Sequence, residues 1–385
     1  MDKLRIYHFH NGSRGGVLSV IRNLLFYSQN YEIENHVVYT INKDRTPEFC
    51  VPGLDGASSE QIFYYSPHCN FYYTCRKLAK LLPDDKTLVI AHDWLELGMM
   101  SNLGLQNPLV LFLHGDYDYY YQLAQKHEHS IDQFICVAQN IESNLSALLP
   151  ARRESIAYLR FPVPEVITKN LTQNDFHIIF IGRLTEGKGY PLLPVIAKEL
   201  RRRNIDIFWH IIVASDKETD STLWDKNIGV HVYNNISNEQ VMGLLGQMKM
   251  IILPSLAEGM PIAIIEAMKA GVIPLVNNID GGIQELVVDG ETGYKINRNE
   301  IVDYVEKIIL LLGNKNLAEK IKINCIEKAN LMFEPMNNTK RVESVFESTI
   351  LSSREVKLAS KIYGSRLDQP FLPNILIYIL RKLKR

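Results

Sequence analysis

The 385-residue sequence lacks the main features of secreted, nucleic-acid-binding and membrane-spanning proteins. Its five cysteines are odd in number and form no CxxC pair, so a reduced compartment with free thiols is the simpler expectation. Lys plus Arg number 42 and Asp plus Glu 43, so no excess of charge points to nucleic acid. The first residues show no apolar region like that of a secretory signal. We therefore expect a cytoplasmic protein.

Long apolar runs are also missing, since none approaches the roughly 20 residues of a spanning helix. The nearest is "FLPNILIYIL" at 371–380, followed by the basic "RKLKR". This tail allows two interpretations. It packs on the N-terminal domain, or it lies on a membrane surface and makes the protein peripheral on the inner membrane face.

The composition is that of a globular protein, with 46% apolar and 22% charged residues, and the length favours two domains. Short apolar runs alternate with helical patterns, which is typical of βαβ units around a parallel sheet. The alternation pauses at the proline-rich and polar residues 160–176 and then restarts. We predict two doubly wound domains joined by a linker near 162–175. The expected strands are at 4–9, 36–41, 87–92, 109–114, 133–138, 177–182, 208–214, 230–233, 250–255 and 272–276.

The turn "GRLTEGKGY", residues 182–190, follows one of these strands and precedes a helix. Its glycines permit close backbone approach, and Arg183 and Lys188 put two cations on one short loop. Such a loop suits a diphosphate. It is not a Walker loop, because Gly189 follows Lys188 where Ser or Thr would stand. The alternative is a solvated basic turn.

The stretch "LPSLAEGMPIAIIEAMKAG", residues 253–271, holds two carboxylates eight residues apart. A helix beginning at Pro261 and ending by Gly271 is apolar nearly all round, so Glu266 is expected to be buried and to need donors. Glu266 lies about 7 Å along the axis from the helix start, which matches the span from a diphosphate to its ribose. The alternatives are an internal salt bridge for Glu266 and a solvated loop acid for Glu258.

Together these segments resemble retaining glycosyltransferases of family 4, which have the GT-B fold. The resemblance rests on "EGMPIAIIEAMKAG", on "GRLTEGKG", on "GGIQELVVDGETGYKI" at 281–296, on "RGGV" near the N-terminus and on "LVLFLHGDY". It covers roughly residues 4–350. It implies an α/β protein with two Rossmann-like doubly wound parallel-sheet domains facing across a cleft, followed by C-terminal helices. We predict an acceptor-side domain at 1–162, a donor-side domain at 163–350 and a helical tail at 351–385.

The resemblance also implies roles for particular residues. Arg183 and Lys188 would hold the donor diphosphate and stabilise it as a leaving group, Glu266 would bind the ribose, and Glu258 would lie beside the transferred sugar. His114 would lie near the reacting centre, although a lone histidine after a strand is more often structural. Further donor contacts are expected from Gly15, Gly16, Gly259, Met260, Pro261 and Ile262.

The implied reaction is transfer of a hexosyl unit, with retention of configuration, from a nucleoside-diphosphate sugar of UDP or GDP type to a glycan or lipid-linked acceptor. No metal and no further cofactor would be required, because the cations take the role of a metal. Asp116 and Asp118 form a DxD sequence that is used for metal binding in another glycosyltransferase fold, but nothing else supports that use. Tyr117 and the tyrosines 119–121 fit either an acceptor site or a packed aromatic loop.

Two departures from the family leave the nucleotide open, namely "SDKETD" at 215–220 and Asn234-Asn235, both where glycine is usual. Two other functions also remain open. One is a sugar-nucleotide epimerase or phosphorylase on the same fold, and the other is a non-catalytic nucleotide-sugar-binding subunit.

Overall fold

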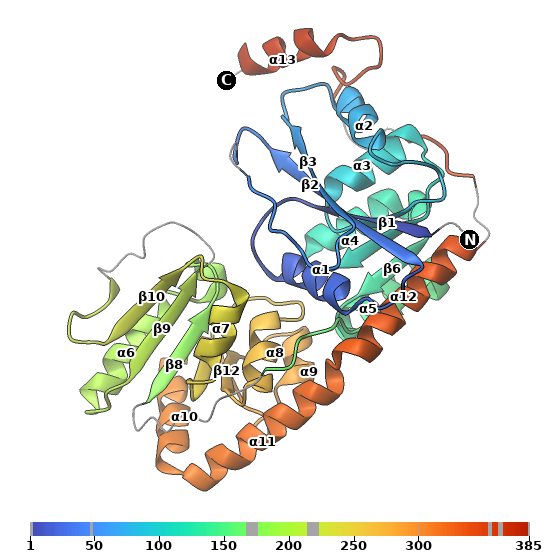
Figure 1. The fold of residues 1–385 in the computed structure, drawn as a ribbon. Helices are drawn as coiled ribbons and strands as arrows, with labels where there is room; N and C mark the ends of the chain where they lie inside the picture. Colours follow the sequence, from blue (N-terminus) through green and yellow to red (C-terminus); the bar gives the residue numbers. More distant parts are fainter. Residues whose placement is uncertain are drawn as a thin grey trace. The chain divides into compact units, whose positions relative to one another are not determined.

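The computed structural model describes residues 3–46, 49–166, 176–213, 223–298, 300–352, 356–360 and 365–383. The chain forms two compact units, Met1–Pro162 with Met336–Arg385, and Val163–Pro335 (Figure 1). The chain passes from the first unit to the second directly after residue 162, where a domain boundary was predicted, and returns to the first unit after Pro335. The second unit ends at Pro335 and not at residue 350, because the helix after Pro335 belongs to the first unit. Most of the predicted linker, like the turn at 215–220, lies outside the described residues.

The first unit is a seven-stranded sheet in the order β3-β2-β1-β4-β5-β6-β7, with every pairing parallel. Its strands are β1 (Leu4–His10), β2 (Ile33–Asn42), β3 (Ser59–Tyr65), β4 (Leu88–Ala91), β5 (Leu109–Leu113), β6 (Gln133–Cys136) and β7 (Ile156–Tyr158). Every residue of β4 and β5 is buried, as expected for central parallel strands covered on both faces.

The helices of the first unit either connect these strands or lie after the point, near Pro335, where the chain returns to this unit. They are α1 (Gly16–Tyr27), α2 (Phe71–Ala79), α3 (Trp94–Leu103), α4 (Asp118–His127), α5 (Gln139–Leu148), α12 (Pro335–Leu351) and α13 (Asn374–Leu383), with 3-10 turns at Glu128–Ser130 and Pro150–Ser155. Helix α12 packs on this unit through Glu343, whose carboxylate accepts from Ser28 Oγ at 2.5 Å. Its Phe346 contacts His8 edge to face.

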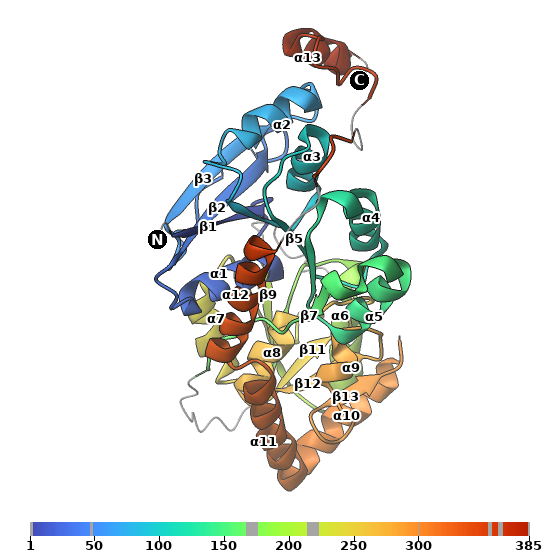
Figure 2. The ribbon, with the colours of Figure 1, turned by 90° about the vertical axis from the view of Figure 1, so that its right-hand side faces the viewer.

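The second unit is a six-stranded parallel sheet in the order β10-β9-β8-β11-β12-β13. Its strands are β8 (His177–Ile181), β9 (Phe208–Val213), β10 (Val230–Asn234), β11 (Met250–Leu253), β12 (Ile273–Asn277) and β13 (Tyr294–Ile296). Its helices are α6 (Leu192–Arg202), α7 (Asn238–Leu245), α8 (Ile262–Lys269), α9 (Gly282–Leu286), α10 (Ile301–Gly313) and α11 (Lys315–Met332), with a 3-10 turn at Glu186–Lys188. Helix α11 packs beside α8 (Figures 1 and 2).

The sequence predicted ten of these strands and missed β3, β7 and β13. Strand β3, "SEQIFYY", pairs with β2 alone at the sheet edge and is nowhere fully buried, so it lacks an apolar run. Strands β7 and β13 have three residues each, too few to show a pattern. In each sheet the strand order changes direction once, between β1 and β4 in the first unit and between β8 and β11 in the second. We call this point the winding reversal. In such sheets ligands bind where strands end at this reversal.

Candidate functional site

Two loops of the second unit meet at its winding reversal. The loop after β8 carries the predicted cations, and the loop after β11 carries Glu258. The amide of Leu256 donates to the carbonyl oxygen of Gly187 at 3.0 Å, which joins the loops directly. Gly189 has φ 69, and a Cβ there would collide with the Pro254 carbonyl. Only glycine therefore allows this approach.

A buried polar cluster fixes the loop after β11 from below. The side-chain amide of Asn277, at the end of β12, donates to the carbonyl oxygens of Pro254 at 2.8 Å and Ser255 at 3.1 Å. The amide oxygen of Asn277 accepts from the Tyr304 hydroxyl at 3.0 Å. Because the Asn277 side chain is hydrogen-bonded at both its nitrogen and its oxygen, it holds the loop that carries Glu258 in place.

The central feature of the site is an ion pair between these loops. Lys188 Nζ lies 2.6 Å from Glu258 Oε1, and the side chains are 22% and 7% exposed. The alternative that Glu258 is a solvated loop acid is therefore wrong. The predicted roles placed Lys188 at the diphosphate and Glu258 at the sugar, and the contact brings these two side chains into one cluster.

The other predicted cation differs from Lys188. The side chain of Arg183 is exposed and forms no hydrogen bond or ion pair with the residues that the structure describes. An exposed guanidinium retains all its donors for an anion from solution.

Helix α8 and the turn before it hold the other second-unit residues that were predicted to contact the donor. It starts at Ile262 with Pro261 as N-cap, and Glu266 is buried at 6% exposure. Pro261 has no amide hydrogen and cannot donate, so it can only shape the loop. The carbonyl of Gly259 accepts from Gly282 N at 2.6 Å, which ties this turn to α9. The backbone donors left for a ligand are the amides of Gly259, Met260 and Ile262.

The sequence interpretation gave no role to Lys269, on the same helix as Glu266. Its buried Nζ donates to the carbonyl oxygens of Val163 at 2.6 Å and Phe333 at 2.9 Å, one near each end of the unit. Burial lowers the pKa of this ammonium to about 8. The alternation of the sequence could not reveal this contact, because both partners are backbone atoms far away along the chain.

The first unit has a cavity of about 200 Å³ at its own winding reversal. It is lined from the end of β1, the start of α1, the end of β4 and helix α4, by His10, Asn11, Ser13, Val17, His92, Asp93, Tyr119 and Tyr120. The predicted residues Gly15 and Gly16 lie in the same loop and open α1. Polar residues predominate in this lining, which is suited to a ligand with several hydroxyl groups.

Asp93 organises this cavity, although the sequence interpretation did not single it out. Its carboxylate accepts from Asn11 Nδ2 at 2.8 Å and from the hydroxyl of Tyr119, and it caps α3. Glu96 completes the capping box by accepting from the amides of His92 and Asp93, at 2.8 and 2.6 Å. Burial raises the pKa of Glu96 to about 8. The D-x-x-E spacing directly after the β4 strand is the sequence signal that could have found this pair.

The predicted His114 is held by a second histidine. Its Nε2 lies 2.8 Å from His92 Nδ1, so one ring donates and the other accepts. Burial lowers the pKa of His114 to about 3 and that of His92 well below its ordinary value, so both rings are neutral at pH 7. His92 lines the cavity, whereas His114 is not among its lining residues and reaches it only through His92.

The Asp116-Tyr117-Asp118 sequence is part of the local hydrogen bonding. Asp116 accepts from Tyr121 at 2.5 Å and from Asn140 at 2.7 Å, one on each carboxylate oxygen. Asp118 begins α4. Within the described ranges, no group of three or more His, Cys, Asp or Glu is placed to hold a metal ion.

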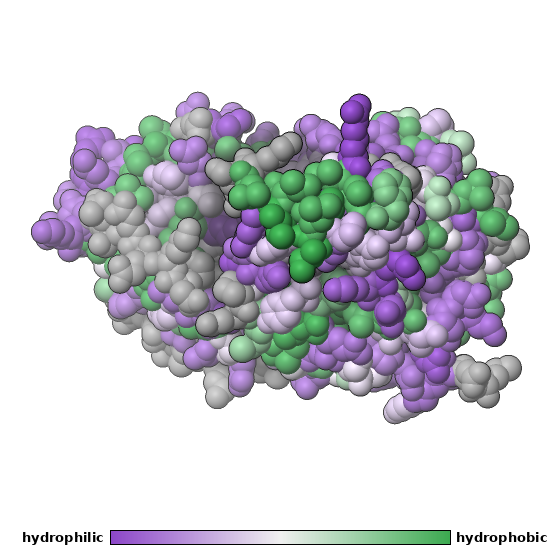
Figure 3. Space-filling view, turned by 90° about the horizontal axis from the view of Figure 1, so that it is seen from above, coloured by the Kyte–Doolittle hydropathy of each residue, from purple (hydrophilic) through white to green (hydrophobic). Residues whose placement is uncertain are grey.

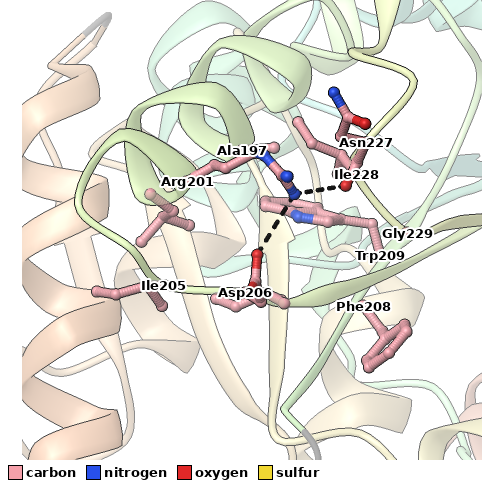
Figure 4. A pocket seen from close by; sticks show the side chains of 11 residues that line it. Ala197, Arg201, Ile205, Asp206, Phe208, Trp209, Asn227, Ile228 and Gly229 are labelled. Carbon is pink, nitrogen blue, oxygen red and sulfur yellow. Dashed lines mark hydrogen bonds and ion pairs between the residues drawn. The ribbon is translucent and has the colours of Figure 1, made fainter.

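A larger cavity of about 290 Å³ lies elsewhere in the second unit (Figure 4). It is bounded by α6 and the amino ends of β9 and β10, where Arg201 donates to the Asn227 carbonyl at 2.5 Å. This is the opposite end of the strands from Lys188 and Glu258, so it is separate from the candidate site.

Residues 164–328 match the family described as Glycosyl transferases group 1. This segment is a group 1 glycosyltransferase domain. It includes Arg183, Lys188, Glu258 and Glu266, the side chains of the candidate donor site. The comparison does not extend to the cavity of the first unit.

Curated relatives extend the likeness beyond the group 1 domain. The chain is 21% identical over 345 residues to an uncharacterized glycosyltransferase of Methanocaldococcus jannaschii, covering 80% of this chain and 92% of the relative. It is 28% identical over 185 residues to the Escherichia coli UDP-Gal:alpha-D-GlcNAc-diphosphoundecaprenol alpha-1,3-galactosyltransferase. That match covers 46% of this chain and 45% of the enzyme, so it spans less than half of either protein.

Solved structures establish the fold around the group 1 domain. The chain superposes on the pneumococcal O-GlcNAc transferase GtfA, solved with UDP and GlcNAc, with a TM-score of 0.75 at 11% identity, covering 91% and 100% of the two chains. For Anabaena HepE with UDP-glucose the TM-score is 0.72 at 15% identity, covering 89% and 99%. Both units together have the GT-B fold that the sequence resemblance implied.

Proposed function

We propose that the protein is a retaining glycosyltransferase that moves a hexosyl unit from a UDP- or GDP-sugar to a hydroxyl of a glycan or lipid-linked acceptor. The observation that carries the proposal is the Lys188–Glu258 ion pair of 2.6 Å between two loops of the group 1 domain. A cation and a carboxylate in contact, with Arg183 exposed on the same loop, suit a ligand that has a diphosphate next to a sugar.

In this proposal Lys188 and Arg183 oppose the charge that grows on the leaving diphosphate. The amides of Gly259, Met260 and Ile262 add donors near the start of α8. Glu266 accepts from the ribose hydroxyls, and Glu258 orients the transferred sugar. The leaving diphosphate assists removal of the acceptor proton, so no side chain is required as a nucleophile, and we propose that no metal is required.

We assign the acceptor to the cavity of the first unit. Asp93 and Asn11 offer hydrogen-bonding groups for the hydroxyls of the acceptor. The neutral pair His92 and His114 can polarise an acceptor hydroxyl without adding a charge to the cavity. The relatives support this acceptor class. The names of the E. coli enzyme and of a Campylobacter jejuni N-acetylgalactosaminyltransferase, 20% identical over 268 residues, both specify diphosphoundecaprenol-linked acceptors.

The test is a screen of UDP- and GDP-sugars for thermal stabilisation and slow donor hydrolysis, with and without EDTA. One donor is expected to raise the melting temperature and to be hydrolysed equally well with EDTA present. Glu258→Gln should abolish the hydrolysis, whereas Asp206→Asn, an exposed acid of the same unit, should not. Activity that disappears with EDTA and returns with Mn²⁺ would refute the metal-free mechanism and revive Asp116 and Asp118.

The same screen separates the alternatives. Isomerisation of the free sugar nucleotide, or dependence on phosphate, would identify an epimerase or phosphorylase instead. Donor binding without any turnover, even with acceptors, would indicate a binding subunit.

A further inference from the structure

Helix α13 (Asn374–Leu383) is attached to the first unit by its polar side. Asn374 Oδ1 accepts from the Asn70 amide at 2.7 Å, and Arg381 donates to the Cys69 carbonyl and to Asp368, both at 2.6 Å. Ile377 is fully buried beside them. Asn374, Ile377 and Arg381 follow the i, i+3, i+7 spacing of one helical face, so several contacts fix the orientation of α13.

The opposite side of α13 is apolar and faces outward. Six large apolar side chains of α13 and the turn before it are 40–78% exposed, namely Phe371, Ile375, Leu376, Ile379, Leu380 and Leu383. Figure 3, seen from above Figure 1, shows hydrophobic side chains gathered on the face where α13 lies. A surface helix of a globular protein normally turns its apolar stripe inward, so this arrangement is the reverse of the usual one. An apolar patch of this kind marks an interaction surface.

Cations flank this patch. The ammonium groups of Lys382 and Lys43 lie 5.0 and 5.7 Å from the centre of the Tyr378 ring. The sequence continues with Lys384 and Arg385. Among the nearby acids, Asp368 is neutralised by Arg381, and Asp44 accepts from Ser66. An apolar stripe with basic residues at one end is the composition of helices that lie in a lipid interface.

The size of the patch argues against a second copy of the chain as its partner. A ten-residue helix is about 15 Å long and about 10 Å wide, so its outer face covers on the order of 150 Å² in projection. A stable protein interface buries about 800 Å² on each partner. A bilayer has no such minimum, because insertion of a few side chains suffices when cations add to it.

We propose that α13 is a membrane-surface helix whose outer face enters the head-group and acyl-chain boundary of an anionic bilayer. The argument for membrane binding depends on α13 alone. The purpose of that binding, access to a lipid-linked acceptor, rests on the proposed function. Because the group 1 domain takes no part in membrane binding, a test of donor chemistry and a test of membrane binding can fail independently.

The experiment is sedimentation of the full-length protein with phosphatidylcholine vesicles and with vesicles containing phosphatidylglycerol. Wild type is expected to bind the anionic vesicles at low salt and to lose most binding at high salt. Ile375→Gln with Ile379→Gln should weaken partitioning about tenfold or more, because exposed apolar area is removed while the contacts of Ile377 and Arg381 remain. Lys382→Gln should weaken it about fivefold and reduce the salt dependence.

The matched control is Ile323→Gln with Leu331→Gln, which removes two exposed apolar residues from α11 in the other unit. It should bind vesicles as wild type does. Both double variants should keep the wild-type melting temperature and donor hydrolysis measured without lipid. Wild type that ignores anionic vesicles, or a double α13 variant that binds unchanged, would overturn the inference. A concentration-dependent dimer that the α13 variant abolishes would overturn it in favour of a second copy.

Discussion

At the scale of single residues, the candidate donor site places Lys188 and Glu266 in different surroundings. Lys188 is partly exposed and paired with a carboxylate, whereas Glu266 is buried on α8. In the proposed reaction, the charge beside Lys188 would grow as the glycosidic bond breaks, whereas the ribose contacts of Glu266 would be similar in the ground and transition states. The two residues should therefore differ in the kinetic parameter that they control.

Lys188→Ala should lower kcat by a factor on the order of 10²–10³, because a preorganised cation at the leaving group is lost. Glu266→Ala should mainly raise the KM for the donor. Steady-state kinetics with the identified donor measure both effects, with Lys226→Ala as the control for loss of an exposed lysine. Near-wild-type kinetics of both variants would show that the donor site is placed wrongly.

At the scale of elements, the loop between β8 and α6 depends on close contact with the loop after β11. Gly189 makes this contact possible because it has no Cβ. Gly187, two residues earlier, has room for a Cβ. A Cβ at Gly187 would meet nothing nearer than Thr185 Oγ1 at 3.9 Å. The two glycines therefore form an internal comparison within one loop.

Gly189→Ala should cost about 1–3 kcal/mol of unfolding free energy, because it adds strain at positive φ and a collision with the Pro254 carbonyl. It should also lower kcat, since it displaces Lys188, the preceding residue. Gly187→Ala should change the unfolding free energy by less than about 1 kcal/mol. Urea unfolding measures both. Equal stabilities for the two variants would contradict the packing described for these loops.

At the scale of the whole molecule, the first unit carries several buried histidines. Burial lowers the pKa of His8, His10 and His127 to about 4 each. The unfolded chain binds protons at about pH 6.5, and the folded chain binds them only near pH 4. Stability is therefore full above pH 6.5 and falls as the pH drops toward 4. Glu96, whose pKa is raised to about 8, has the opposite slope between its ordinary pKa and pH 8.

Lowering the pH from 7.5 to 5 should destabilise the first unit by about 2 kcal/mol for each such histidine, partly offset by Glu96. His10→Asn is suited to test one of them, because its amide oxygen can take the place of His10 Nδ1, which accepts from the Gly12 amide at 3.1 Å. Denaturant unfolding at both pH values should show a smaller loss for this variant. The same loss in both proteins would mean that His10 is protonated in the folded state.

The sequence alone predicted which segments form the buried strands, where the chain leaves the first unit, and which loops carry the residues proposed to bind the donor. Apolar runs, proline and glycine act within a few residues, so they can be interpreted locally. Asn235 illustrates this, since its φ of 52 explains why glycine is usual there and why asparagine is tolerated.

The tertiary structure alone decided which distant residues meet. The strand order brought His10 and Asp93 to one cavity and joined Lys188 to Glu258 across 70 residues. The packing of helices placed Lys269 on the carbonyl oxygens of Val163 and Phe333. It also determined that α13 contacts the first unit through its polar side and leaves its apolar side outward. The pattern of a helix fixes which residues share a face, but only its packing partners determine which face is covered.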